Sequence, residues 1–117
     1  MNNDEQLTFG KVLCSLIKKA KMTQAQFYQK IGITKSYFYD IAGGKTNPPP
    51  AELQIKMLAL LNPSREDEIL FLDLAGKERK ETPADIAWYL DSHVDQKNML
   101  REEINYSVFV RGERGNG

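Results

Sequence analysis

Residues 22–50 read MTQAQFYQKIGITKSYFYDIAGGKTNPPP, and the capping residues in this stretch constrain the fold more than any other part of the chain. Thr23 and Gln26 have the spacing of a capping box, in which a Thr hydroxyl and a Gln side chain each accept a free backbone N–H at a helix start. Gly32 ends that helix because glycine adopts the left-handed conformation easily, and Thr34 can cap the next one. The stretch therefore predicts two short helices joined by a tight turn.

The apolar and polar residues of this stretch separate onto different faces of the two predicted helices. The apolar residues fall at helical spacing on each arm, with one more in the turn. They are Phe27, Ile31, Ile33, Phe38 and Ile41. The second helix shows polar side chains outward at Lys35, Ser36, Tyr37, Tyr39 and Asp40. A surface with so many hydrogen-bonding groups suits the major groove of DNA.

At these residues the chain resembles the lambda-repressor-like, or XRE-family, helix-turn-helix regulators of bacteria and phages. The residues that match the family pattern are Thr23, Gln24, Phe27, Ile31, Gly32, Ile33, Thr34, Ser36, Tyr37, Phe38, Asp40, Ile41, Gly44, Lys45 and Pro48. Phe27-Tyr28 replaces the Leu-Ala that the family usually has, and Ala42-Gly43 replaces its common Glu-Asn. The resemblance implies an all-α fold, with a lambda-repressor-like helix-turn-helix domain that binds double-stranded DNA.

The resemblance also implies which residues contact the DNA. Gln24 takes the place of a family glutamine that touches a phosphate and braces the recognition helix. Lys35 and Ser36 lie on the first exposed turn of that helix, where a lysine suits guanine O6 and N7, and Ser36 could equally serve as an N-terminal cap. The expected DNA-binding residues are Gln24, Thr34, Lys35, Ser36, Tyr37, Tyr39, Asp40, Lys45, Thr46 and Asn47.

Several of these residues could act in more than one way. Tyr39 can stack against a thymine methyl group or donate to a phosphate. Asp40 can accept from cytosine N4 or pair within the protein, and we favour the internal pairing because phosphates repel a carboxylate. Tyr37 is expected to pack against the neighbouring helix with its hydroxyl on a phosphate. Residues 45–47 follow the helix in a loop that can reach the DNA backbone.

The charged residues divide the chain into two oppositely charged halves, although the formal net charge is zero. Residues 1–50 carry 7 basic and 3 acidic residues, a net charge of +4, and residues 51–117 carry 9 basic and 13 acidic residues, a net charge of −4. A basic half can follow a phosphate backbone while an acidic half points away from it. Ordinary solvated surface charge is the alternative interpretation.

Composition argues against several other classes of protein. No apolar run approaches the roughly 20 residues of a membrane span, and the polar start MNNDEQ differs from a signal peptide, so we expect a cytoplasmic protein. Cys14 and His93 are the only cysteine and histidine, too few for a disulfide or a zinc site. We therefore expect no cofactor, no metal and no enzymatic activity. Cys14 shares an apolar helix face with Leu13 and Ile17 and is expected to be a buried structural thiol.

The rest of the chain is also predicted to be helical. Helices are expected at residues 8–21 and 50–61, followed by a break at Asn62-Pro63 and a fifth helix that begins near Ser64. The fifth helix is apolar on more than one face and must be buried on two sides. Thr82-Pro83 then restarts a helix.

The second half also resembles part of the same family. Residues 72–77 and 82–90, LDLAGK and TPADIAWYL, are similar to a segment downstream of the DNA-binding part in a subgroup of XRE-family regulators. A short polar helix follows from Ser92, then a β-favouring run at 106–110 that we expect to be an extended arm. We divide the chain into a helix-turn-helix domain (1–62), a helical dimerisation or partner segment (63–110) and a disordered tail (111–117).

The expected function is that of a sequence-specific transcriptional regulator, a repressor that binds a pseudo-palindromic operator. Such specificity normally requires two recognition helices one DNA turn, roughly 34–36 Å, apart, so we expect a homodimer. The alternative is an antitoxin-like autoregulator whose C-terminal half binds a partner protein, and the aromatic Trp88 and Tyr89 suit an interface or a core. The expected dimer residues, which could instead only roof the first four helices, are Leu70, Leu74, Ile86, Trp88 and Leu90.

Overall fold

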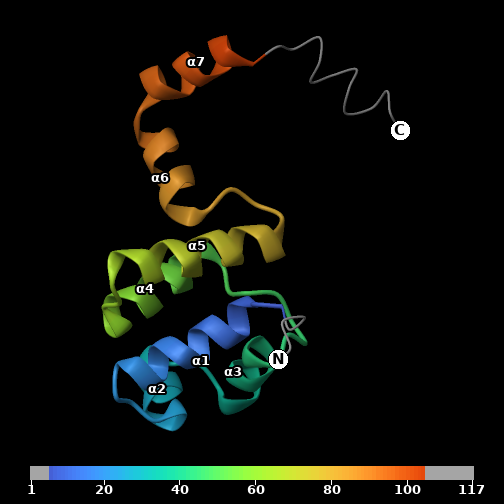
Figure 1. The fold of residues 1–117 in the computed structure, drawn as a ribbon, viewed down its shortest axis with the longest axis vertical. Coiled ribbons are helices and arrows are strands. Elements are labelled where there is room, and N and C mark those ends of the chain that lie inside the picture. Colours follow the sequence, from blue (N-terminus) through green and yellow to red (C-terminus); the bar gives the residue numbers. More distant parts are fainter. Residues whose placement is uncertain (1–5, 105–117) are drawn as a thin grey trace. The chain divides into compact units, whose positions relative to one another are not determined.

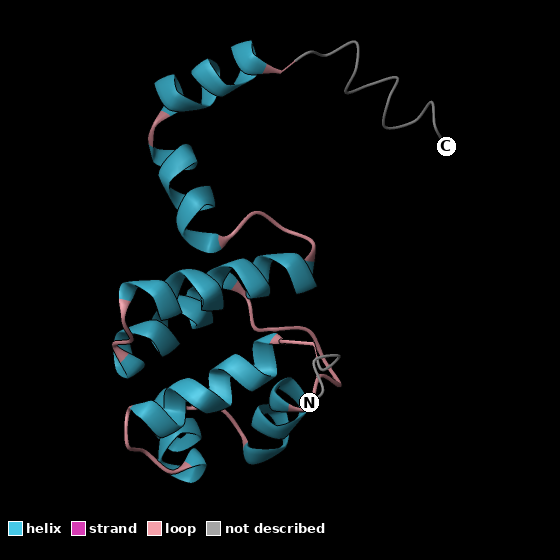
Figure 2. Cartoon of the chain, in the orientation of Figure 1, coloured by secondary structure: helices cyan, strands magenta, loops and turns pink. Residues whose placement is uncertain are grey.

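The computed structural model describes residues 6–104, and this part of the chain is all-α, as the sequence predicts (Figures 1 and 2). Its contacts divide the chain into two compact units, Met1–Ala84 and Asp85–Gly117. The expected arm at 106–110 and tail at 111–117 lie outside the described residues. The helices are α1 (Phe9–Lys19), α2 (Gln24–Ile31), α3 (Lys35–Ala42), α4 (Ala51–Leu61), α5 (Arg65–Arg79), α6 (Ala84–Ser92) and α7 (Val94–Glu103).

The two short helices begin and end at the predicted capping residues. Thr23 Oγ1 accepts from the backbone N–H of Gln26 at 3.0 Å, and Gln26 Oε1 accepts from that of Thr23 at 2.9 Å. Gly32 ends α2 with φ at 87°, in the left-handed region that favours glycine. Thr34 then caps α3 by accepting from the N–H of Tyr37 at 3.0 Å. The two helices and their turn are therefore confirmed.

The core of the first unit is built around two pairs of phenylalanines. The rings of Phe27 and Phe38, from α2 and α3, have centroids 5.9 Å apart, and those of Phe9 and Phe71, from α1 and α5, lie 4.7 Å apart. All four side chains are buried. Gly10 lets α3 approach α1 closely, since a Cβ there would collide with the carbonyl oxygen of Ala42.

Helix α5 belongs to the first unit, so this unit ends at Ala84 and not at Asn62 as we predicted. Phe71, Leu72 and Ala75 are buried in its core. The helix runs antiparallel to α1, as Figure 1 shows: Asp67 near its start pairs with Lys19 at 2.9 Å, and Glu78 near its end accepts from the N–H of Phe9 at 2.8 Å. The boundary differs because α5 completes the core that α1 to α4 begin.

The described part of the second unit contains two short helices, and neither of them has a buried residue. Trp88 is 67% exposed, the highest value among the large apolar side chains of the described residues. The other exposed large apolar side chains of this unit are Ile86, Tyr89, Val94, Met99, Leu100 and Ile104. Helices of nine and ten residues are marginal in water by themselves, so these two depend on contacts that would cover their apolar side chains.

Candidate nucleic-acid interface

One face of α3 is buried and the opposite face is exposed. Phe38 and Ile41 are buried in the core. Lys35, Ser36 and Tyr39 are exposed, as the sequence predicts, whereas Tyr37 and Asp40, which were also expected to face outward, are half-buried. Because residues three and four positions apart are neighbours on a helix surface, Tyr39 lies beside both Ser36 and Lys35, and we call these three exposed side chains the α3 face.

The remaining predicted DNA-binding residues lie close to this face in sequence and in structure. Gln24 lies at the start of α2 and is half-buried. Thr34 is the exposed N-cap of α3. Tyr37 packs against the core through its half-buried side chain. The loop after α3 exposes Lys45, Thr46 and Asn47.

Gln24 connects three helices through its side-chain amide. Its Oε1 accepts from the hydroxyl of Tyr39 on α3 at 3.2 Å. Its Nε2 donates to Sγ of Cys14 on α1 at 3.7 Å. Cys14 is half-buried, less than we predicted, and burial raises the pKa of its thiol, so the sulfur is a neutral acceptor at neutral pH. Nothing in the sequence pattern indicates that Cys14 takes part in this link.

Asp40 differs from its predicted role. We expected its carboxylate to pair within the protein, yet within residues 6–104 that carboxylate makes no hydrogen bond or ion pair. Its backbone carbonyl is the group that makes contacts, accepting from the N–H of Lys45 at 2.8 Å and of Thr46 at 3.3 Å. The chain reversal at Gly44, where φ is 78°, turns these two amides back toward the Asp40 carbonyl oxygen.

The charges of this region suit phosphate contact. Lys35 and Lys45 are exposed, and neither forms an ion pair within the described part of the chain. By contrast, the charge of Lys19 is partly neutralised by Asp67, with Nζ and Oδ2 2.9 Å apart. The α3 face and the loop at 45–47 therefore carry positive charges that an external anion could meet.

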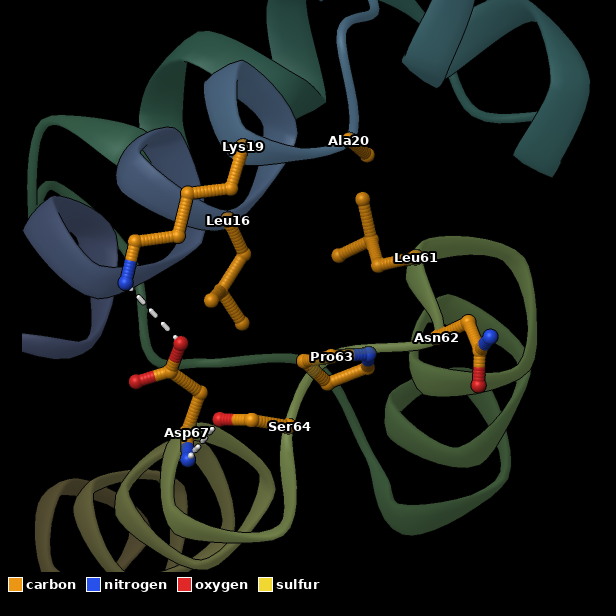
Figure 3. Close-up of a pocket in the computed structure, with 8 residues that line it drawn as sticks. All are labelled: Leu16, Lys19, Ala20, Leu61, Asn62, Pro63, Ser64 and Asp67. Atoms are coloured by element: carbon orange, nitrogen blue, oxygen red, sulfur yellow. Dashed lines mark hydrogen bonds and ion pairs between the residues drawn. The ribbon is translucent and has the colours of Figure 1, made fainter.

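A separate pocket of about 220 Å³ lies where α1, α4 and α5 meet (Figure 3). Three of its polar residues already contact each other, because Lys19 reaches Asp67 and Ser64 Oγ accepts from the N–H of Asp67 at 3.1 Å. The Lys19 and Asp67 charges therefore already face each other. The residues that line it are Leu16, Lys19, Ala20, Leu61, Asn62, Pro63, Ser64 and Asp67.

The range 6–104 contains no three His, Cys, Asp or Glu side chains that gather closely enough to hold a metal ion. None of its helices has both the length and the apolar character to cross a membrane.

Comparisons with protein-family models, with curated proteins and with solved structures found no match.

Proposed function

We propose that this protein is a sequence-specific regulator of transcription that binds double-stranded DNA, a repressor of the lambda-repressor-like, XRE-family type. The α3 face carries the proposal: Lys35, Ser36 and Tyr39 are exposed together on a short helix whose opposite side is fixed in the core. A helix held in this way can enter the major groove and present side chains to base edges. Such a regulator acts beside the chromosome, in the cytoplasm.

The geometry suggests a division of roles among the proposed contacts. Lys35 and Ser36, on the first turn of α3, would read base edges. Tyr39 would contact the DNA through its ring, because its hydroxyl hydrogen is already donated to Gln24. Residues 45–47 would meet phosphates, which position a protein without reading sequence.

We further propose that the protein binds its operator as a homodimer. Ile86 and Trp88 in the second unit are exposed and Leu90 is half-buried, so these expected interface residues are available to a second chain. Leu70 and Leu74 are half-buried and pack against the core of their own chain. This fits the alternative expectation, that they cover the first four helices, better than a place in the dimer contact. The contact therefore involves the second unit.

The same exposed side chains favour a second candidate function. A partner protein could cover Trp88 and its neighbours, as expected for an antitoxin-like autoregulator whose C-terminal half binds another protein. In this case the first unit would still bind DNA, and the protein would purify from its natural host together with a stoichiometric partner.

The proposal is tested by measuring how salt and two lysine substitutions affect binding to a duplex selected from a random pool. Affinity should fall steeply from about 50 to 200 mM salt, because each neutralised phosphate releases counterions. Lys45→Ala should weaken binding to all sequences alike and reduce the salt slope by about 1, whereas Lys35→Ala should relax the preference at one base position by about 1–3 kcal/mol.

Lys56→Ala provides the matched control, since it removes an exposed lysine on α4, outside the proposed interface. It should leave both the affinity and the salt slope close to those of the unaltered protein. Binding that does not depend on salt, or the same loss from all three substitutions, would contradict the proposed contacts.

A further inference from the structure

The loop that follows α3 is held in place by the last residue of α5. Arg79 Nη1 donates to the carbonyl oxygen of Pro48 at 2.9 Å. Its Nε and Nη2 donate to the two carboxylate oxygens of Glu81, each at 3.0 Å. The Arg79 side chain is only 22% exposed. Three of its donors are therefore engaged within the protein.

Glu81 reaches Arg79 because the chain reverses sharply after α5. Residues two apart do not face each other on a helix, but Lys80 has a φ of 60° and the N–H of Glu81 donates to the carbonyl oxygen of Gly76 at 2.8 Å. Gly76 has no room for a side chain, because a Cβ would lie 2.8 Å from the carbonyl oxygen of Glu81. The hydrogen bond between Arg79 and Glu81 raises the pKa of the guanidinium and lowers the pKa of the carboxylate, so both groups stay charged at neutral pH.

The exposed residues 45–47 are thus fixed by hydrogen bonds on both sides. On one side, the N–H groups of Lys45 and Thr46 donate to the carbonyl oxygen of Asp40 at the end of α3. On the other side, Pro48 is buried and its carbonyl oxygen accepts from Arg79. A short segment fixed at both ends has few backbone conformations left, and a displaced anchor would displace the exposed side chains with it.

We infer that Arg79 is a positioning residue for DNA binding, which sets the loop at 45–47 where its side chains meet phosphates and does not itself contact the DNA. This inference rests on the proposed function. The paired hydrogen bonds from the Arg79 guanidinium to the two carboxylate oxygens of Glu81, which we call the fork, are stronger than neutral hydrogen bonds. They depend on the planar shape of the guanidinium, so lysine cannot replace arginine here. From its residue type alone, Arg79 would be taken for a phosphate contact or for solvated surface.

The test compares Arg79→Lys, Glu81→Gln and Arg65→Lys in the full chain. Arg65 is the matched control, since it begins the same helix and is 72% exposed. Arg79→Lys keeps the charge but loses the fork, and should lower affinity for the selected duplex about tenfold. Glu81→Gln should lower it about threefold, because it loosens Arg79. Arg65→Lys should have no effect.

The sign of the Glu81→Gln effect separates positioning from direct contact. If Arg79 met a phosphate, Glu81→Gln would raise the affinity for DNA, because it removes the competing carboxylate. Arg79→Lys would then keep most of the affinity of the unaltered protein. Either result overturns the inference. In the Arg79→Lys background, Lys45→Ala should cause much less loss than in the unaltered protein, because a displaced Lys45 has already lost its phosphate. Full additivity of the two losses would also overturn it.

Amide hydrogen exchange of the free protein gives a readout that does not depend on DNA. Exchange at Lys45 and Thr46 should become faster in Arg79→Lys and stay unchanged in Arg65→Lys. Unchanged exchange in both variants overturns the inference while leaving the proposed function intact. Faster exchange in a protein that binds no duplex at all overturns the proposed function and the role in DNA binding together, and leaves Arg79 as an anchor of the loop.

Discussion

The side-chain amide of Gln24 uses both of its ends inside the protein. It accepts from Tyr39 and donates to Cys14, so a residue at the start of α2 links α1 to α3. Through this link the Tyr39 side chain already has a preferred position before any ligand arrives. A side chain ordered in advance loses less conformational entropy on binding, which favours affinity.

A double-mutant cycle tests this link. Tyr39→Phe keeps the ring and removes the hydroxyl, and should weaken binding to the selected duplex by about 0.5–1.5 kcal/mol. In the Gln24→Ala background the same change should have almost no effect, because its acceptor is gone. The control is Tyr28→Phe on α2, whose ring also packs near Phe38. Equal effects of Tyr39→Phe in both backgrounds would exclude a functional link.

At the scale of helices, α5 shows which parts of the fold could be predicted from the sequence. The helix starts were predicted correctly at Thr23, Thr34 and Ser64, because a capping residue bonds to a backbone N–H only three residues away. The partner of α5 could not be predicted in this way. Asp67 meets Lys19, which is 48 residues distant, and an apolar helix face does not specify which other helix covers it.

The candidate site likewise has features that local sequence spacing predicts and features that it does not. Exposure of the α3 face follows from helical spacing, so Lys35, Ser36 and Tyr39 were placed correctly. The neighbours of Asp40 and Arg79 depend on chain reversals at Gly44 and Lys80, where φ is positive. Such reversals decide which distant groups meet, and the periodicity of the sequence carries no information about them.

Phe71→Ala tests whether α5 is part of the first unit's core. Phe71 is fully buried against Phe9, so the substitution should destabilise this unit by about 3–5 kcal/mol in urea unfolding followed by circular dichroism. Ile69→Ala on the same helix is the control; Ile69 is exposed and its loss should change stability by only about 0.5 kcal/mol. A small effect from both would mean that α5 is an appended segment.

At the scale of the whole molecule, the second unit is expected to make the dimer. A chain that ends at Ala84 retains the complete core of the first unit, whereas one that ends at Asn62 would lose α5. In sedimentation experiments the chain ending at Ala84 should be monomeric and bind the selected duplex weakly, while the full chain should be a dimer.

Single substitutions refine this experiment without removing a segment. Trp88→Ala should dissociate the dimer of the full chain, since an exposed aromatic anchor often dominates an interface. Leu70→Ala should lower stability and leave association unchanged, because Leu70 packs on its own core. A monomeric full chain that binds the duplex with undiminished affinity would contradict a dimer altogether.

The exposed state of α6 and α7 also has a consequence for the lifetime of the protein in a cell. Helices without buried residues open readily, and proteases cleave segments that open. If a second chain covers them, a newly made molecule is vulnerable until it finds its partner, and the rate of this encounter rises with concentration. Scarce protein would then be degraded and abundant protein spared, so a small change in synthesis would produce a larger change in operator occupancy.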